Sequence, residues 1–498
     1  MKRKMGALGL ILVLLALVSF LFGKQWDGQG RKGELSGRET EAAKEREKLV
    51  VVFPGSYANT EDLTMVEERV NEIVCKELGI EVELRVISGH YSNTVKKMLA
   101  GKDQVDIVNM GNQLYMESYI NGYLCDIEEL LLRYGQGIID AVGMENINAC
   151  RIRDVLYGLT NNRDYAAGWD GYVLRKDILD KYQIKKEDLK TIEDLEAVYD
   201  LLLEKEPDII PVASGASMLS NFPLADGING FPAGGHLNYG QEEELVNIFE
   251  SEEYKERLRR VRKWYLKGYL GDYSPIEEAS VRGRMKRGEI FSIPTNGKPG
   301  IEQQESMACG RELVFVQFGE TAITYNSMAA SPWVITQNTV DQKASMQLLN
   351  LMYTNGEIMN LLSYGVEGVH YVKTEDGHIT LPEGKTENIF ISNAWRMPNQ
   401  FITYVWEGNP LNMWELMDEH NKNALQSCEI GFNFDISEVT SQYVAVNSIY
   451  SKYRRILENG LVDPEQGLEA MLKDLRENGL DEVIDEKRKQ FMEWKKRN

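Results

Sequence analysis

The side chains that carry most enzyme chemistry are present in this sequence, but their spacing forms no catalytic pattern. None of the five histidines stands in an H-E-x-x-H arrangement, and no serine lies in a G-x-S-x-G turn. The five cysteines form neither a C-x-x-C pair nor a Cys/His cluster. Carboxylates are abundant, yet nearly all lie on predicted helix faces among Lys and Arg, where they are ordinarily solvated. The sequence therefore predicts no metal site and no enzyme, and a pair of catalytic carboxylates stays open as an alternative.

Three loop-like stretches instead place aromatic rings beside small polar residues. Residues 165–172, 331–333 and 393–399 each contain a tryptophan close to Gly, Ser or Asn. A flat ring can cover the C–H face of a polyhydroxylated ligand while nearby amides and carboxylates meet its hydroxyls. Core packing is the ordinary role of a single tryptophan, so the prediction rests on the joint occurrence of the three stretches. Together they favour an uncharged polyhydroxylated ligand.

The elements that must position these rings alternate between strand and helix. An apolar run at 49–53 predicts a buried strand. Residues 62–78 carry apolar side chains at helical spacing, and residues 80–86 alternate strictly, which predicts a helix and a second strand. A helix at 92–100 and a strand at 105–108 follow. Right-handed crossovers turn this β-α-β-α-β order into a parallel sheet covered by helices, an α/β fold.

In such sheets a ligand binds beyond the carboxyl ends of the strands. Here these ends are the polar stretches 54–57 and 109–113, which both contain glycine. Neither is a G-x-G-x-x-G loop or a G-x-x-x-x-G-K-[ST] loop. The sequence therefore predicts a ligand at this edge of the sheet and no cofactor.

The rest of the chain continues the alternation and ends in a helical region. Thr191 precedes a helical pattern with acidic residues in its first turn, which is typical of a capped N-terminus. The predicted strands are 209–213 and 289–294, and the predicted helices are 172–183, 191–205, 251–267, 341–353, 356–363, 438–458, 463–475 and 477–495.

The N-terminal residues have the pattern of an export signal. Met1 is followed by three basic residues, and residues 5–23 contain no charged side chain. Residues 1–23 are predicted to be a signal peptide or an uncleaved anchor, and residues 24–47 a flexible tether rich in Gly and charge. The 498-residue chain has a formal net charge of −21. This charge argues against nucleic acid as a partner, because phosphate binding needs clustered Lys and Arg.

The opening alternation, with Asp106-Ile107-Val108 in its third strand, resembles the first lobe of extracellular solute-binding proteins of ABC importers. The Asn- and Trp-rich stretch 393–409 and the helical tail resemble the C-terminal region of the carbohydrate-binding branch of that family. The resemblance covers roughly residues 48–498. Four further stretches resemble the same branch, 156–159, 171–182, 297–300 and, most specifically, Ser-Tyr-Gly-Val-Glu-Gly-Val-His-Tyr at 363–371.

The resemblance implies a two-lobed, periplasmic-binding-protein-like (type II) α/β fold with hinge strands and a helical C-terminal region. It places lobe one at 48–160 plus 281–335 and lobe two at 161–280 plus 336–498. Members are usually lipid-anchored through a cysteine after the signal, and since none follows here, an uncleaved helix would take its place. The implied cleft between the lobes collects nine ligand-binding residues: Tyr57, Asn112, Asn161, Trp169, Tyr172, Lys298, Trp333, Glu367 and Trp395.

The function that the resemblance implies is the extracytoplasmic substrate-binding component of an ABC transporter. This component would capture an oligosaccharide or related polyol by lobe closure and deliver it to a membrane permease. It would be a monomer without cofactor, tethered at or secreted from the extracellular face of the cytoplasmic membrane. The alternatives are a secreted carbohydrate-active enzyme and a peptide- or lipid-precursor-binding receptor of the same fold.

Overall fold

The structure is a computed structural model in which Arg46–Asn498 form one compact unit. The predicted signal or anchor at 1–23, the predicted tether at 24–47 and Tyr57 lie outside the described residues. Within the part of the chain that is described, no helix is both long and apolar enough to cross a membrane. The described residues are 48–55, 60–213, 215, 217–219, 226, 231–271, 278–386, 388 and 390–497.

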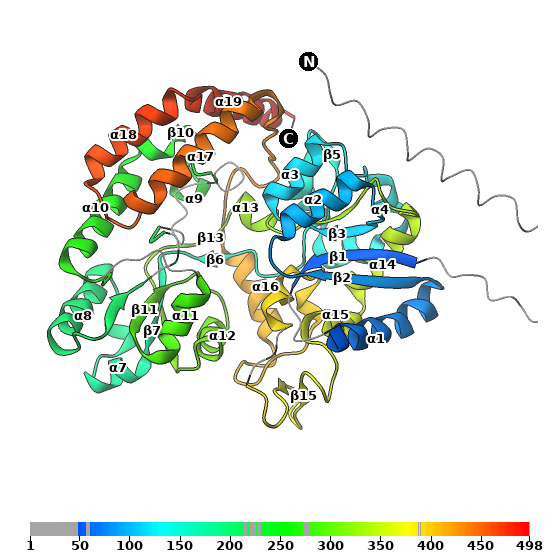
Figure 1. Ribbon diagram of the computed structural model, residues 1–498, viewed down its shortest axis with the longest axis horizontal. Coiled ribbons are helices and arrows are strands. Elements are labelled where there is room, and N and C mark those ends of the chain that lie inside the picture. Colours follow the sequence, from blue (N-terminus) through cyan, green and yellow to red (C-terminus); the bar gives the residue numbers. More distant parts are fainter. Residues whose placement is uncertain are drawn as a thin grey trace, which may run out of the picture. The chain divides into compact units, whose positions relative to one another are not determined.

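The first large sheet forms around the predicted apolar run and has the strand order β14-β3-β1-β2 (Figure 1). Its central strand β1 pairs in parallel with β2 and β3, as predicted, whereas β14 pairs antiparallel with β3. Residues 49–53 of β1 are buried because both faces of this strand are covered. The four strands are β1 (Lys48–Pro54), β2 (Glu81–Ile87), β3 (Ile107–Asn109) and β14 (Trp333–Ile335).

Alternate residues of β1 belong to two hydrophobic clusters on opposite faces of this sheet. Leu49 and Val51 pack in one cluster with α1 (Thr60–Leu78) and α14 (Gln342–Thr354). Val50 and Val52 pack in the other cluster with α2 (Tyr91–Gly101). Because successive side chains of a strand point to opposite faces, β1 packs against helices on both faces of this sheet.

The second large sheet has the order β12-β7-β11-β8. Its strands are β7 (Gly171–Arg175), β8 (Ile210–Val212), β11 (Ile290–Pro294) and β12 (Leu313–Gln317). All five residues of β7 are buried, and this strand pairs antiparallel with both β11 and β12. The predicted helix over 172–183 is therefore wrong for 172–175, and the helix α7 covers only Lys176–Lys181. A short apolar run buried on all sides has no period that separates helix from strand, and Tyr172 and Val173 favour a strand.

The two sheets divide the chain differently from the sequence-based boundaries. β11 and β12 fall within 281–335, the range assigned to lobe one, yet both pair with β7. Conversely, α14 and α15 (Gly356–Tyr364) fall within the range assigned to lobe two, yet both pack on α1. The chain crosses from one sheet to the other after β12, so position along the chain does not reveal which sheet a strand joins.

A small sheet of order β17-β13-β6 lies where three passages of the described chain run between the large sheets (Figure 1). β6 (Ala167–Gly168) precedes β7, and β13 (Thr321–Ile323) lies between β12 and β14. β17 (Leu425–Gln426) leads from α16 (Met413–Asn423) to the C-terminal helices. Since β13 pairs with both of its neighbours, the three passages are joined to one another by backbone hydrogen bonds.

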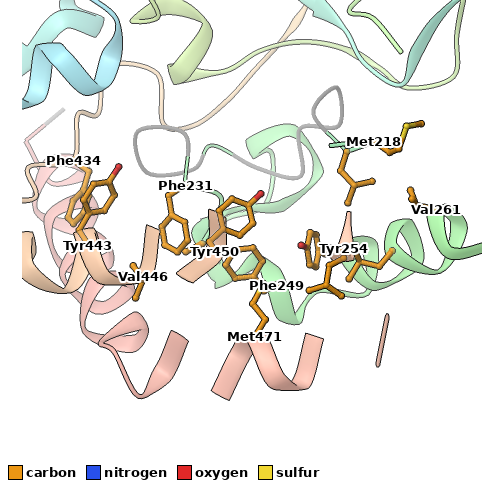
Figure 2. Packing of buried hydrophobic residues seen from close by; sticks show 14 of the residues in the cluster. Met218, Phe231, Phe249, Tyr254, Val261, Phe434, Tyr443, Val446, Tyr450 and Met471 are labelled. Carbon is orange, nitrogen blue, oxygen red and sulfur yellow. The ribbon is translucent and has the colours of Figure 1, made fainter. Parts of the chain in front are cut away.

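The C-terminal region consists of α17 (Thr440–Leu457), α18 (Pro464–Arg476) and α19 (Leu480–Lys495), near the predicted bounds. α18 packs on α17 and on α10 (Glu252–Lys267). Figure 2 shows Tyr450 of α17 beside Phe231 and Phe249, with ring centroids 5.6 and 5.4 Å away. These rings belong to the hydrophobic cluster that contains Tyr172 of the second sheet and Val50 of the first, so the helical tail shares a core with both large sheets.

The remaining elements are short or lie at the periphery. They are α3 (Asn112–Ile120), α4 (Glu128–Tyr134), α5 (Gln136–Val142), α6 (Met144–Ile147), η1 (Asn148–Cys150), β4 (Arg151–Ile152), β5 (Val155–Leu156), η2 (Lys186–Asp188), α8 (Ile192–Lys205), β9 (Gly234–His236), α9 (Leu237–Gly240), β10 (Leu245–Asn247), η3 (Ile248–Glu250), α11 (Glu278–Arg287), α12 (Ile301–Cys309), α13 (Tyr325–Met328), β15 (Val372–Lys373), β16 (Ile379–Thr380), η4 (Ile391–Arg396), η5 (Gln400–Ile402) and η6 (Ser437–Val439).

Candidate ligand-binding site

The predicted residue Asn161 holds the loop that contains the predicted residue Trp395. Asn161 is buried, and its Nδ2 donates hydrogen bonds to the carbonyl oxygens of Arg396 at 2.5 Å and Met397 at 3.0 Å. The ring of Trp395 is half-buried, which leaves part of it accessible. The structure thus brings these two predicted residues together, with Asn161 positioning the loop and Trp395 able to meet a ligand.

Two guanidinium groups lie against the ring of Trp395. The Cζ atom of Arg396 is 4.3 Å from the ring centroid, and that of Arg163 is 5.3 Å away. Both distances are those of cation–π contacts, which hold the planar guanidinium groups beside the indole. Arg163 also donates to the carbonyl oxygen of Ser327 at 2.6 Å, so α13 takes part in fixing this arrangement.

The predicted residue Lys298 joins the same group through a buried carboxylate. Its Nζ lies 2.7 Å from Oδ2 of Asp164, and Arg163 lies 3.4 Å from the other oxygen of that carboxylate. Burial raises the pKa of Asp164, but the positive charges of Lys298 and Arg163 outweigh burial and hold the pKa below its ordinary value. Asp164 is therefore ionised at neutral pH and neutralises part of the positive charge at this position.

The predicted residue Asn112 lies at the start of α3, beside α13. Its Nδ2 donates to Oδ1 of Asn326 at 3.3 Å, while its own Oδ1 is buried without a hydrogen-bond partner among the described residues. Asn326 neighbours Ser327, the residue that accepts from Arg163. Asn112 therefore borders the Arg163–Trp395 group, at the carboxyl end of β3 where the sheet rule placed a ligand.

The predicted residue Trp169 lies at the other end of this region, where β6 leads into β7. It is half-buried, and its Nε1 is 3.4 Å from the carbonyl oxygen of Ala322 in β13. Gly168 and Gly297 exchange two backbone hydrogen bonds of 2.7 Å, which places Lys298 one residue from that pairing. A Cβ atom on Gly168 would lie 1.9 Å from Oε1 of Gln317, so a larger residue here would displace the end of that side chain.

The structure does not place three of the predicted residues where a ligand could touch them in this group. Tyr172 is completely buried as the second residue of β7. Trp333 is completely buried in β14, and its Nε1 donates to the carbonyl oxygen of Arg396 at 2.8 Å, so it supports the Trp395 loop from the core. The side chain of Glu367 is 49% exposed and pairs with Lys373 at 2.9 Å. Tyr172 and Trp333 thus lie in the core of the two sheets, Glu367 lies at the surface, and the ligand contacts of all three stay predictions.

Sequence reasoning missed the charged members of this group. Arg163 and Asp164 lie just after Asn161, and Arg396 directly follows Trp395. The pattern of aromatic rings beside small polar residues does not include these adjacent charged residues. Among the described residues there is no cluster of three or more His, Cys, Asp and Glu side chains that could hold a metal ion.

Two α/β halves joined by a small crossing sheet, with aromatic and polar side chains where the passages meet, define the solute-binding-protein class of fold. The crystal structure of the N-glycan transport solute binding protein NgtS from Streptococcus pneumoniae is similar to this chain with a TM-score of 0.79 and 21% identity, over 90% of this chain and 99% of that protein. Its complex with Man5GlcNAc gives a TM-score of 0.73 over 91% of this chain and 99% of that protein, again at 21% identity. These neighbours confirm the predicted two-lobed α/β fold.

In sequence, the chain is 23% identical over 472 residues to a carbohydrate ABC transporter substrate-binding protein of Streptococcus pneumoniae serotype 4, covering 93% of this chain and 94% of that protein. It is 24% identical over 320 residues to the polygalacturonan/rhamnogalacturonan-binding protein YtcQ of Bacillus subtilis, covering 57% of this chain and 59% of YtcQ. Residues 429–496 match a domain of unknown function, DUF3502. The resemblance drawn from the sequence motifs is confirmed over nearly the whole chain.

Proposed function

We propose that this chain is the extracytoplasmic substrate-binding component of an ABC importer and that its ligand is an oligosaccharide. The observation that carries the proposal is the fold match to NgtS, which spans 90% of this chain and 99% of NgtS. The similarity to a carbohydrate ABC transporter substrate-binding protein over 93% of the chain supports the same class. In this proposal the chain binds and releases its ligand unchanged, and other chains hydrolyse ATP.

The ligand contacts of the proposed site come from the aromatic and polar side chains on both sides of the crossing sheet. Trp395 and Trp169 offer half-buried rings, Lys298 offers a hydrogen-bond donor to sugar hydroxyls, and Oδ1 of Asn112 offers an acceptor. A ring contact contributes about 0.5–1.5 kcal/mol beyond its buried area, and each hydrogen bond about 1 kcal/mol. With the area term, such contacts are enough for micromolar affinity, which corresponds to about 8 kcal/mol.

Closure of the two halves turns, in this proposal, about the crossing sheet of β6, β13 and β17. A ligand that touches both halves binds the closed arrangement better, and this difference in affinity shifts the equilibrium toward closure. The TM-score falls from 0.79 for NgtS to 0.73 for its complexes with Man1GlcNAc and Man5GlcNAc. By this measure the present structure is more similar to the first NgtS structure than to the two glycan complexes.

Delivery requires a membrane permease that recognises the closed form. The predicted N-terminal anchor or signal would keep the body at the extracellular face of the cytoplasmic membrane, tethered or released. We place the chain there as a monomer, because closure of one polypeptide suffices to enclose a ligand.

The test is a binding and turnover experiment on the purified full chain. Man5GlcNAc and other N-glycan-type oligosaccharides are titrated by calorimetry, and each mixture is assayed for new reducing ends. We expect saturable binding without product. New reducing ends would instead show the secreted enzyme, and binding of peptides in place of sugars would show the alternative receptor.

A pair of tryptophan variants locates the site. Trp395→Ala is expected to weaken glycan binding at least tenfold with little change in melting temperature, because the ring is half-buried beside the loop. Trp333→Ala is the matched control, and it should lower the free energy of unfolding by about 3–5 kcal/mol because that ring is completely buried. Unchanged affinity in folded Trp395→Ala would remove Trp395 from the site.

A further inference from the structure

The charges beside Trp395 do not balance. Arg163, Lys298 and Arg396 bring three positive charges to the group, and Asp164 brings one negative charge. The surplus of two positive charges stands in a chain that has 77 acidic and 56 basic residues. Acidic side chains are thus plentiful in this protein, yet only one described carboxylate contacts this group.

Arg396 accounts for one of the two surplus positive charges. The guanidinium is half-buried, and its one hydrogen bond to a described residue reaches Oγ of Ser331 at 3.4 Å. Burial lowers the pKa of Arg396, and the neighbouring Arg163 charge acts in the same direction. A guanidinium has five N–H donors, and most of those of Arg396 have no partner among the described residues.

Two other arginines that are at least partly buried, Arg175 and Arg454, have carboxylate partners. Arg175 contacts Asp177 at 2.6 Å, and Arg454 contacts Glu458 at 3.1 Å. Leaving a half-buried guanidinium without an anion costs free energy, because the charge loses water and gains no partner. The ring of Trp395 offsets part of that cost and keeps the guanidinium plane in place.

We infer that Arg396 binds the carboxylate of an acidic sugar whose ring lies against Trp395. This inference rests on the proposed function and names the substrate class of the same site. A carboxylate accepts two parallel hydrogen bonds from one guanidinium, a geometry that no single sugar hydroxyl offers. The ligand is therefore an oligosaccharide with a uronate or sialate residue, in place of the uncharged ligand that the aromatic stretches favoured.

The experiment compares acid and neutral forms of the same sugar on the full chain. The probes are trigalacturonate with its methyl ester, and sialyllactose with lactose, titrated by calorimetry at low and high NaCl. In at least one pair the acid should bind more tightly by roughly 10- to 100-fold, which is the strength of a charge-assisted pair. This preference should shrink as NaCl rises, because salt screens the partly exposed charge.

Arg396→Gln should abolish the preference for the acid, so that the acid and neutral forms bind with equal affinity. The control is Arg133→Gln, which makes the same change in net charge at an exposed position on α4. If Arg396→Gln does not fold, Arg396→Lys keeps the charge without the planar fork and should reduce the preference partially.

Each outcome has one meaning. Equal affinity for acid and neutral forms, or a preference that survives in Arg396→Gln, overturns the inference and leaves the receptor proposal standing. If none of these probes or the N-glycan oligosaccharides binds to the folded chain, the proposed function falls, and the inference falls with it. A preference lost in Arg396→Gln and kept in Arg133→Gln supports both.

Discussion

One backbone carbonyl, that of Arg396, fixes the loop that presents the Trp395 ring. Asn161 Nδ2 donates to it at 2.5 Å and Trp333 Nε1 at 2.8 Å, and Asn109 Nδ2 lies 3.5 Å away. All three donor side chains are buried. A buried donor that lost this acceptor would cost roughly 1–3 kcal/mol. The loop is therefore held by the core beneath it, although it is far from Asn161 along the chain.

A second residue of interest is Asp226, whose carboxylate caps α13 from a buried position. Its Oδ2 accepts from the backbone N of Tyr325 at 3.0 Å, and its Oδ1 accepts from that of Asn326 at 3.4 Å. Burial, reinforced by the charge of Glu429, raises the pKa of Asp226 to about 6. Asp226 thus titrates near physiological pH in the folded chain.

The sign of the resulting pH dependence follows from the direction of this shift. The folded-state pKa lies above the ordinary value of 3.8, so the folded chain holds this proton more tightly than the unfolded chain. The contribution of protonated Asp226 to the free energy of unfolding is full below pH 3.8 and is lost as pH rises through about 6. Asp226→Asn should therefore gain stability relative to the unsubstituted chain between pH 4 and pH 7, by at most about 3 kcal/mol. Urea unfolding of both proteins across this range measures the difference, and a constant difference would contradict the prediction.

At the scale of elements, a buried lysine of the last helix, α19, makes hydrogen bonds that fix this helix to β9. Lys487 of α19 is 1% exposed, and its Nζ donates to the carbonyl oxygens of Asp226 at 2.9 Å and Gly234 at 2.8 Å. It also lies 2.6 Å from Oε2 of Glu429, which is equally buried. Glu429 in turn meets Nδ1 of His236 at 2.9 Å. These contacts connect the DUF3502 region with β9 and, through Asp226, with α13.

Removing this lysine should be far more costly than removing an exposed lysine of the same helix. Lys487→Met leaves the carboxylate of Glu429 buried without its cation and is expected to lower the free energy of unfolding by about 3–5 kcal/mol. Lys489→Met, two residues further on, removes a side chain that is 60% exposed and pairs with Glu486, and it should change stability by less than about 0.5 kcal/mol. Denaturant titration of both variants makes the comparison, and equal effects would refute the structural role of Lys487.

The helices could be predicted closely because their ends have local signals. Thr191 and Asp194 form a capping box at α8, and the Ser251 side chain accepts from Tyr254 N at the start of α10. The strand β7 could not be predicted this way, since its apolar run is set by pairing with β11 and β12. The predicted boundaries between the two halves differ from the observed sheets for a related reason. The sheet that a strand joins depends on pairings between distant strands, which no local pattern encodes.

The site could be predicted only in part. Asn161 and Trp395 were identified, and the structure joins them although they are more than 200 residues apart. Tyr172 and Trp333 resembled ligand contacts because exposure of an aromatic ring cannot be read from its neighbours in sequence. No sequence pattern indicates the role of Arg396, because the fold decides which carboxylates lie near a guanidinium.

At the scale of the whole molecule, the crossing sheet joins the passages between the halves through short strands. β6 and β17 are two residues long and β13 is three, so few backbone hydrogen bonds resist rotation there. By contrast, β1 pairs with β2 over seven residue pairs within one half. Rotation about the crossing sheet would therefore break fewer strand pairings than deformation inside either half, as expected of a hinge.

A bound glycan should both close and stabilise the molecule. Because only the closed form lets one ligand touch both halves, saturation should lower the radius of gyration measured by small-angle X-ray scattering. At a ligand concentration of 100 times Kd, mass action should also raise the free energy of unfolding by about 2.7 kcal/mol. Trp395→Ala, examined at the same ligand concentration, should show a smaller change in both quantities. A ligand that stabilises the chain by this amount without any fall in radius of gyration would mean that it binds to one half alone, and the crossing sheet would then be a rigid connection.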